Sequence, residues 1–417
     1  MLVAGCLARV ANAAEITRVA SSFEARDPFG MFLDVAYVRT QELARIDREG
    51  RQQGTVQDMA ELRYVGVDSR LDMAAHVGIW RDLELSVAVP LVFAHSGRWG
   101  FARGTTAASS TVTNNCLNAN GSLVSAACPD TGDGRTSLFP VPGQSFRGGV
   151  GDLRFGVAWG VFKQAKDDTK PDWVLGFDYQ APTASRFDPS VPTDAEHRGR
   201  LGDRVQRFTP STALSRKLGI AEPYVKVSWT LPALGHGTSS NCDHPNPLNQ
   251  GAPDNCNVAT WTRKETGLHP ATEGHFIFGT ELNAYDEPSL RQRFAIDLQG
   301  ILNYVGPGRY DNELSSPLGK LLSTGEYLQA GGAVTLVAQA SEVIGLRAAF
   351  TLLYSTPHPL TQEQPGKDLN GNGTVDRSAG SVEANPNFDD RIDLASRRFR
   401  IAEVATFRFD FTATFRF

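Results

Sequence analysis

The chain has 417 residues, of which 41% are hydrophobic and 21% charged, and its formal net charge is −5 at pH 7. Its mean hydropathy of −0.26 is too low for a bundle of membrane helices, and no run of about eighteen apolar residues occurs. Because the charge is modest and no basic stripe is interleaved with aromatic residues, the sequence predicts no nucleic-acid partner.

The N-terminal residues are typical of the last part of an export signal, a residual signal peptide whose beginning is missing. Residues 1–13 are mostly apolar and end in Ala11-Asn12-Ala13, the small-x-small pattern that signal peptidase cuts. Cleavage there would leave Ala14 or Glu15 as the first residue. We expect residues 14–28 to form a periplasmic N-terminal segment.

A second interpretation of the N-terminus is a lipid anchor. Val3-Ala4-Gly5-Cys6 resembles a lipoprotein box, which would place a lipid on Cys6. We favour cleavage after Ala13, because only five residues precede the cysteine.

Twelve segments further along alternate between apolar and polar residues, the period of a β-strand with one apolar face. Most reach the roughly ten residues that a tilted strand needs to cross a bilayer. An even number of strands returns the chain to the side where it began, and fourteen is the neighbouring count. The segments are 29–40, 59–79, 83–93, 149–162, 173–181, 205–218, 223–231, 276–285, 294–304, 327–339, 343–354 and 398–417.

The connections between most of these segments are alternately short and long. Trp80-Arg81-Asp82 and the turn at 219–222 are tight, whereas the connections 182–203 and 357–395 are long and polar. This asymmetry distinguishes the periplasmic and external rims of outer-membrane barrels. The sequence therefore predicts an all-β fold, a transmembrane antiparallel barrel of residues 29–417 in a bacterial outer membrane.

The last predicted strand has the clearest pattern. From Arg398 onward one parity is aromatic and apolar, and the other carries arginine, threonine and aspartate. The segment resembles the closing strand of bacterial outer-membrane barrels, whose terminal phenylalanine and alternating aromatics are read by the assembly machinery. That resemblance implies two partners, the assembly machinery and outer-membrane lipid, and assigns the assembly signal to Phe409, Phe411, Phe415 and Phe417.

Two short motifs point to one barrel family. Residues 148–156 read Gly-Gly-Val-Gly-Asp-Leu-Arg-Phe-Gly, and residues 77–85 form a strand-turn-strand followed by Val89-Pro90. Together they resemble the outer-membrane channels found with the meta-cleavage pathway of phenol degradation. Trp80-Arg81-Asp82-Leu83-Glu84 departs slightly from that family's turn. The resemblance implies passage of small apolar or aromatic compounds.

Four cysteines fall into two close pairs within polar loops. An exported protein would oxidise Cys116 with Cys128 and Cys242 with Cys256, each bridge stabilising a loop by about 3 kcal/mol. A metal site is the alternative, although its spacing matches no familiar zinc pattern. Its ligands would be Cys242, His244, Cys256 and His269.

The polar parity of the strands predicts the lining of a pore. Both signs of charge occur, so the side chains could conduct a small solute or fill a narrow lumen as ion pairs. Small inward residues such as Gly156 and Gly160 favour the channel over the plugged structural barrel. The predicted pore-lining residues are Asp34, Arg70, Asp72, Glu84, Asp152, Arg154, Asp178, Lys226, Glu281, Arg293, Asp297, Arg347, Arg400, Arg408 and Asp410.

The last long loop contains a candidate calcium site. Asp368, Asn370, Asn372 and Asp376 place oxygen atoms at positions one, three, five and nine of a calcium loop. Ala379 stands where an EF-hand has its bidentate glutamate, so a solvated Asx-rich turn is the alternative. No other cofactor is predicted.

An enzyme is the competing class of function. His76 and His275 are candidates by residue type alone, and no Gly-x-Ser-x-Gly or His-Glu-x-x-His signature occurs. We therefore predict a passive channel or facilitator for small molecules that is not an enzyme.

Overall fold

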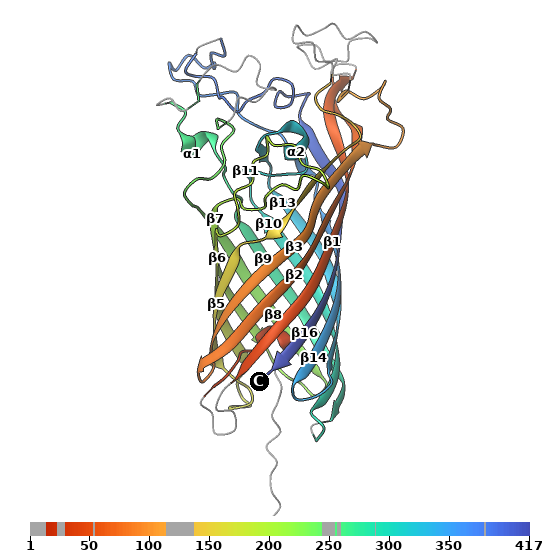
Figure 1. The fold of residues 1–417 in the computed structure, drawn as a ribbon, viewed down its shortest axis with the longest axis vertical. Helices are drawn as coiled ribbons and strands as arrows, with labels where there is room; N and C mark the ends of the chain where they lie inside the picture. The colour runs from red at the N-terminus through yellow and green to blue at the C-terminus, as the bar shows by residue number, and fades with distance from the viewer. Residues whose placement is uncertain are drawn as a thin grey trace, which may run out of the picture.

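Twelve antiparallel strands close into a barrel (Figure 1). This computed structural model describes residues 14–22, 30–52, 55–113, 137–243, 255–256, 260–287, 289–378 and 381–417. The first strand pairs with the second and also with the last, so the wall formed by the twelve strands is closed: Val35 lies opposite both Met73 and Ala413. The prediction of twelve barrel strands is confirmed. They are β1 (Met31–Gln52), β2 (Thr55–Trp80), β3 (Leu83–Phe101), β5 (Leu153–Phe162), β6 (Asp172–Ala181), β7 (Val205–Ser215), β8 (Ala221–Leu234), β9 (Glu273–Glu287), β10 (Gln292–Val305), β13 (Tyr327–Gln339), β14 (Ile344–Ser355) and β16 (Phe399–Arg416).

The connections follow the predicted asymmetry. The turn after β2, at Arg81, and the turn after β7, at 216–220, lie at the end of the barrel that also holds the C-terminus (Figure 1). Long loops leave the opposite end and gather above it. The helices are short: η1 (Glu15–Thr17), α1 (Arg263–Thr266) and α2 (Ser315–Leu318). Among the described residues, no helix is long and apolar enough to cross a membrane.

One predicted strand is divided in two. Residues 149–162 were expected to form a single strand, but β4 (Gly143–Val150) ends before Gly151 and β5 begins at Leu153. β4 pairs with the upper part of β3 and β5 with its lower part. Gly149 has a positive φ of 133°, and a side chain at Gly151 would meet the ring of Pro90 at 2.9 Å. The glycines therefore form a break in the strand rather than its opening.

Loop residues cover the free edge of β4. The amide of Gly199 donates to the carbonyl of Phe146 at 2.9 Å, and the amide of Phe146 donates to Thr193 Oγ1 at 3.1 Å. The side chain of Asp152 ties the break to the next loop, since it accepts from the amide of Ala184 at 2.8 Å. The long β6–β7 loop thus replaces the strand partner that β4 lacks.

β1, β2 and β3 extend well beyond the predicted limits. The expectation that the first strand ends at residue 40 is wrong, because the charged stretch after it continues the ladder to Gln52. Its inward side chains are buried in spite of the neighbouring charges: Ile46 and Arg48 are both 0% exposed. These extensions support an external structure above the barrel, to which we refer as the cap.

A bulge in β16 exchanges the two faces of the last strand. Glu403 has a positive φ of 53°, and the register with β1 shifts at this point. Phe399 and Ile401, expected to face lipid, are buried in the cap at 0% and 1% exposure. Arg400 lies on the opposite face, 3.9 Å from Asp58 above the barrel, which corrects the prediction that it lines the lumen.

The cap has an apolar core of its own. Three loops contribute to it, namely those between β3 and β4, between β10 and β13 and between β14 and β16, together with the upper ends of β1, β2, β3 and β16. The loops contain the small strands β11 (Gly308–Tyr310), β12 (Leu322–Thr324) and β15 (His358–Pro359), of which β12 adds Leu322 to the core. Burying these side chains stabilises the loops by roughly 1.5–3 kcal/mol for each large aliphatic or aromatic group. The cluster consists of Ala44, Ile46, Leu62, Trp99, Val112, Leu138, Phe139, Leu314, Leu318, Leu322, Leu360, Ile392, Phe399, Ile401 and Val404.

Candidate functional site

The outer face of the barrel is apolar as the sequence predicts. Trp159 and Phe350 are each 50% exposed, and Phe278 is 52% exposed, whereas polar inward residues such as Glu281 are buried at 1%. A closed wall with apolar side chains outside and charges inside satisfies its backbone hydrogen bonds in lipid. This is a bacterial outer-membrane barrel.

Most predicted pore-lining charges meet inside the lumen. Arg70 donates to Asp72 (Nε to Oδ2, 3.1 Å), and Arg408 donates to Asp410 (Nε to Oδ1, 3.0 Å). Arg154 on β5 interacts electrostatically with residues of three other strands, namely Asp72, Arg70, Asp178 and Arg408. The middle of the lumen therefore holds both signs of charge in mutual contact.

A second group of predicted residues lies nearer the periplasmic end. Asp297 accepts from the hydroxyl of Tyr224 at 2.5 Å and from Gln299 Nε2 at 2.6 Å. Glu281 forms an ion pair with Arg293, and both are buried. Lys226 interacts with Asp178 at the boundary between the two groups. The role of these residues as the lining of a conducting path stays a prediction.

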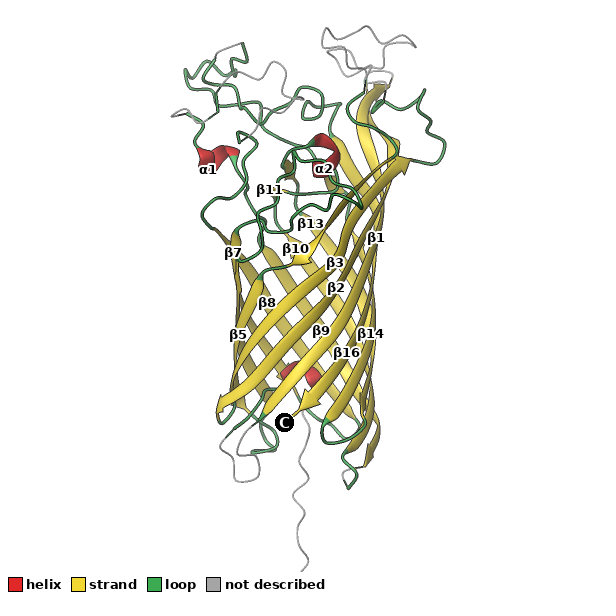
Figure 2. Ribbon diagram, viewed as in Figure 1, coloured by secondary structure: helices red, strands yellow, loops and turns green. Residues whose placement is uncertain are grey.

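Residues 14–22 enter the periplasmic end of the lumen, where η1 lies inside the wall (Figure 2). We call this segment the plug. Thr17 Oγ1 lies 2.8 Å from Ser215 Oγ on β7, and the amide of Ser22 donates to the carbonyl of Arg81 at 2.9 Å. Arg18 stacks over Phe32 at 4.5 Å. The plug thus contacts opposite parts of the wall.

Three inward glutamates bind the backbone of the plug. The amide of Ala20 donates to Glu84 Oε2 at 2.6 Å. The nitrogens of Ala14 and Glu15 donate to the other two, Glu222 Oε1 at 2.6 Å and Glu281 Oε2 at 3.2 Å. Hydrogen bonds to charged acceptors are stronger than neutral ones, so three points fix the path of the segment.

Charged side chains complete the contact on the other side of the plug. Arg18 lies 2.8 Å from Glu15 and 3.9 Å from Asp34, and Arg416 lies 3.9 Å from Glu15. A small gap of about 30 Å³, partly open to solvent, borders these groups and Arg347. Polar groups therefore dominate the closure of the periplasmic end.

Sequence reasoning expected a periplasmic segment and did not anticipate that it enters the lumen. The usable signal was an excess of inward carboxylates near one rim: Glu222 faces Glu281 across β8 and β9, and Glu281 faces Asp297 across β9 and β10. Like charges placed directly opposite are destabilising without a partner. The plug, which precedes the barrel in sequence, supplies the partners of these carboxylates.

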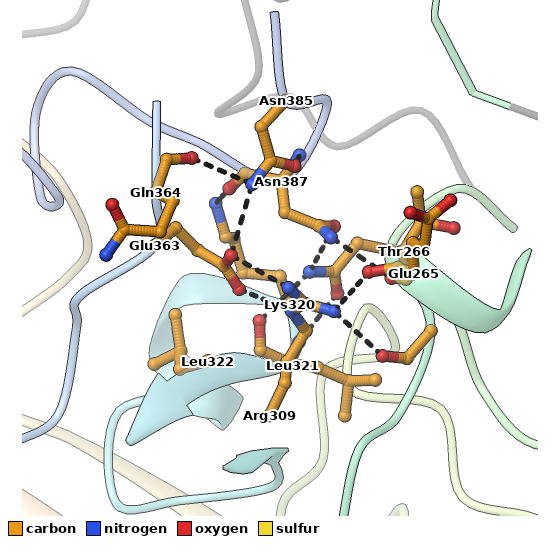
Figure 3. A network of polar contacts seen from close by, with 12 residues as sticks. Glu265, Thr266, Arg309, Lys320, Leu321, Leu322, Glu363, Gln364, Asn385 and Asn387 are labelled. Carbon is orange, nitrogen blue, oxygen red and sulfur yellow. Dashed lines mark hydrogen bonds and ion pairs between the residues drawn. The ribbon is translucent and has the colours of Figure 1, made fainter. Parts of the chain in front are cut away.

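Above the external end of the barrel, a polar network joins three loops of the cap (Figure 3). Lys320 is only 1% exposed, and its Nζ donates to the carbonyl of Asn387 at 3.0 Å. Asn241 Nδ2 donates to the carbonyl of Leu321 at 3.0 Å, and Arg309 forms an ion pair with Glu363. Residues far apart in sequence thus hold one another in place above the lumen.

The structure contains one of the two predicted disulfides. Cys242 and Cys256 are bonded, which confirms that bridge and removes both sulfurs from the alternative metal site. The loop is docked on the last long loop, where Asn255 Nδ2 donates to the carbonyl of Ala384 at 2.9 Å. Cys116 and Cys128 lie outside the described residues, and their pairing stays a prediction.

The candidate calcium ligands are engaged with backbone amides. Asp368 accepts from Gly371 at 2.8 Å and Gly373 at 2.8 Å, while Asn370 accepts from Asn372 at 3.0 Å and Asp376 from Ser378 at 2.9 Å. In the described part of the chain, no group of three or more histidine, cysteine, aspartate or glutamate side chains is placed to hold a metal ion. The arrangement is that of an Asx-rich turn, and structural calcium stays a prediction.

The histidines considered for catalysis have structural partners. His76 Nδ1 lies 2.6 Å from Glu84 Oε1, and its ring stacks on Phe32. His275 Nδ1 lies 3.0 Å from Asn303 Oδ1. These contacts hold the two rings against the barrel wall.

No family model and no curated protein matches the chain. Among solved structures it is similar to the COG4313 outer membrane channel from Pseudomonas putida F1, with 11% identity, 94% of this chain and 96% of that chain covered, and a TM-score of 0.42. A Pseudomonas aeruginosa FadL homologue has 10% identity, 93% and 90% coverage, and a TM-score of 0.35. The outer membrane protease OmpT from Escherichia coli has 8% identity, 93% and 98% coverage, and a TM-score of 0.30.

Proposed function

We propose that the protein is a passive outer-membrane channel for small molecules, and that the plug closes its periplasmic end. The observation that carries the proposal is the chemistry of that closure. A segment of nine residues is held by hydrogen bonds to wall carboxylates and by partly exposed ion pairs. Because water can replace such contacts when the segment moves, the plug can leave the lumen while the wall stays intact.

The charged middle of the lumen supports passage. Arg154 and Asp178 are exposed although they point inward, so the space between them is open to solvent. A lumen filled as a structural core would bury these charges in closed ion pairs. The family resemblance suggests small apolar or aromatic compounds as cargo. The proposal assigns no catalysis to the barrel.

A plugged structural barrel that presents its external loops is the second candidate. The observation that favours it is the cap, whose apolar core and buried network cover the lumen at the opposite end. In that case the charges of the lumen would serve only to hold the wall and the plug together.

Single-channel conductance in a planar bilayer decides between the two. We would compare the folded protein with a variant lacking residues 14–22, and use heat modifiability on gels to confirm that both barrels are folded. The channel predicts at least a roughly tenfold higher conductance or open fraction for the variant. If the folded variant stays silent, the lumen is closed elsewhere and the structural barrel is correct. Swelling of vesicles in phenol or in a sugar of similar size would then test the cargo.

A further inference from the structure

A buried carboxylate in the barrel wall is only half satisfied where the plug begins. Glu222 is 0% exposed and lies near the periplasmic end of β8. Its Oε1 accepts from the nitrogen of Ala14 at 2.6 Å and from Ser215 Oγ at 2.8 Å. Its Oε2 is buried and accepts no hydrogen bond from the residues that the structure describes. A buried acceptor oxygen without a donor is destabilising, so the site calls for a further donor.

The charges around this carboxylate are unbalanced. Glu281 lies directly opposite Glu222 on β9, and Asp172 on β6 interacts with it as well. Arg293 is the cation that acts on Glu222, and it is already paired with Glu281. Two facing carboxylates with one shared cation leave about one negative charge without compensation.

The nitrogen of Ala14 is the atom best placed to supply the missing hydrogen-bond donor and the missing positive charge. As a peptide amide it has one hydrogen and no charge, and this hydrogen serves Oε1. As a chain terminus it would be an ammonium group with three hydrogens and a positive charge, able to serve both oxygens of Glu222. Ala14 itself is 0% exposed, and Thr17 fixes it in place by donating to its carbonyl at 2.9 Å.

The sequence independently places a chain terminus at this atom. Ala11-Asn12-Ala13 is a small-x-small pattern, and cleavage after Ala13 makes Ala14 the first residue. The cut is a hydrolysis, in which water divides the Ala13–Ala14 peptide into a carboxylate and the Ala14 amine, which takes up a proton. The residue that this cut would expose is the residue whose nitrogen lies on Glu222.

We propose that the chain is processed between Ala13 and Ala14, and that the new α-ammonium group binds Glu222 as a buried ion pair that anchors the plug. Glu222 and Glu281 form the acidic side of this site, and Ser215 completes it. The site takes a primary ammonium group at the end of a chain. It does not depend on whether the barrel conducts.

The test starts with the full chain exported to the outer membrane of a Gram-negative host and extracted in detergent. Its intact mass is expected to correspond to residues 14–417. Reductive methylation of the folded protein, followed by peptide mapping, then measures how fast the Ala14 amine reacts. We expect labelling at least about tenfold slower than in the unfolded chain, and fast labelling in Glu222→Gln, which keeps the shape and removes the charge.

Two controls make the result decisive. Asp178→Asn alters a luminal carboxylate away from the plug and is expected to leave the labelling slow. One glycine inserted between Ala13 and Ala14 moves the amine away from Glu222 by one residue and is expected to give fast labelling. The sequence of the barrel is unchanged in this variant, so it tests the proposal even if Glu222→Gln fails to fold. A mature protein beginning elsewhere, or a lipid on Cys6, overturns the proposal. Equal labelling of the parent and both test variants overturns the ion pair.

Discussion

The structures at the two ends of the barrel are held in place in different ways. At the periplasmic end a single short segment makes polar contacts with the wall, and its side chains border a gap open to solvent. At the external end three loops share an apolar core, one of them carries a buried lysine, and a disulfide bond closes part of a further loop. A closure made of a few polar contacts can be released locally, whereas a closure with its own core unfolds as a cooperative unit. The cap is therefore a fixed structure and the plug is the movable one.

The largest expected effect comes from the core of the cap. Leu318 is 1% exposed, and Leu318→Ala should lower the free energy of unfolding of the cap by about 2–5 kcal/mol, because it leaves a cavity. Hydrogen exchange of the cap amides measures the loss. Leu369→Ala, at a position that is 52% exposed, is the matched control and should change little. Faster exchange in the barrel strands as well would show that cap and barrel form one cooperative unit.

The disulfide should also stabilise the cap without affecting the plug. Replacing Cys242 and Cys256 by serine removes a bridge that closes a short loop, worth about 3 kcal/mol on the chain-entropy estimate. We expect proteases to cut between residues 243 and 255 in the folded variant. The conductance should match that of the parent. A changed conductance would assign gating to the cap and reverse the comparison.

Protonation of a buried aspartate should be a further difference between the cap and the plug. Burial raises the pKa of Asp393 in the cap to about 7, with Lys320 opposing the rise and Glu363 adding to it. Asp393 in the folded cap keeps a proton that the unfolded chain loses near pH 4. The contribution of this proton to the stability of the cap is therefore full below about pH 4 and is lost as the pH rises through about 7. Exchange protection of residues 388–398 should fall about a hundredfold between about pH 5 and about pH 8.

The controls for this pH effect are two neighbouring aspartates. Asp393→Asn should flatten the dependence, because asparagine carries no titrating proton. Asp390→Asn, at a side chain that is 58% exposed, should leave it in place. A dependence that survives Asp393→Asn would show that another group in the cap titrates.

The smallest effect concerns one contact of the plug. Glu84→Gln weakens the hydrogen bond from the amide of Ala20 by about 1 kcal/mol, so the open fraction should rise several-fold. Single-channel recording measures it, with Asp178→Asn as the luminal control. High salt should act in the same direction, because the ion pairs of Arg18 are partly exposed. An unchanged open fraction would mean that Glu84 does not hold the plug.

The barrel could be predicted from the sequence because period-two alternation repeats in every wall strand. Phe409 and Phe411 lie outward as their parity requires, at 46% and 43% exposure. The pattern failed where tertiary contacts override it. Arg48 lies in a charged stretch whose composition is typical of a loop, but its side chain is 0% exposed. The bulge at Glu403 moves Phe399 from the lipid face into the cap. Alternation carries no information about a bulge or about what packs above the membrane.

The plug could not be predicted for a different reason. Its residues have no periodicity, and their partners Glu84, Glu222 and Glu281 are distributed over three strands. Each glutamate alone is an ordinary inward charge. Their common function becomes visible only when the barrel brings them to the same rim.

The seam between β1 and β16 joins the two ends of the barrel sequence. Met31 and Phe417 exchange backbone hydrogen bonds at its lower end, at 3.3 and 2.8 Å, and Arg48 pairs with Phe399 at its upper end. Contacts this distant along the chain are slow to form, since a very long loop must close first. The cap core includes Ile46 from one side of the seam and Phe399 from the other. Closing the wall and completing the cap are therefore one late folding event. The plug precedes β1 in sequence, and β1 takes part in this event, so the plug must reach the lumen from there.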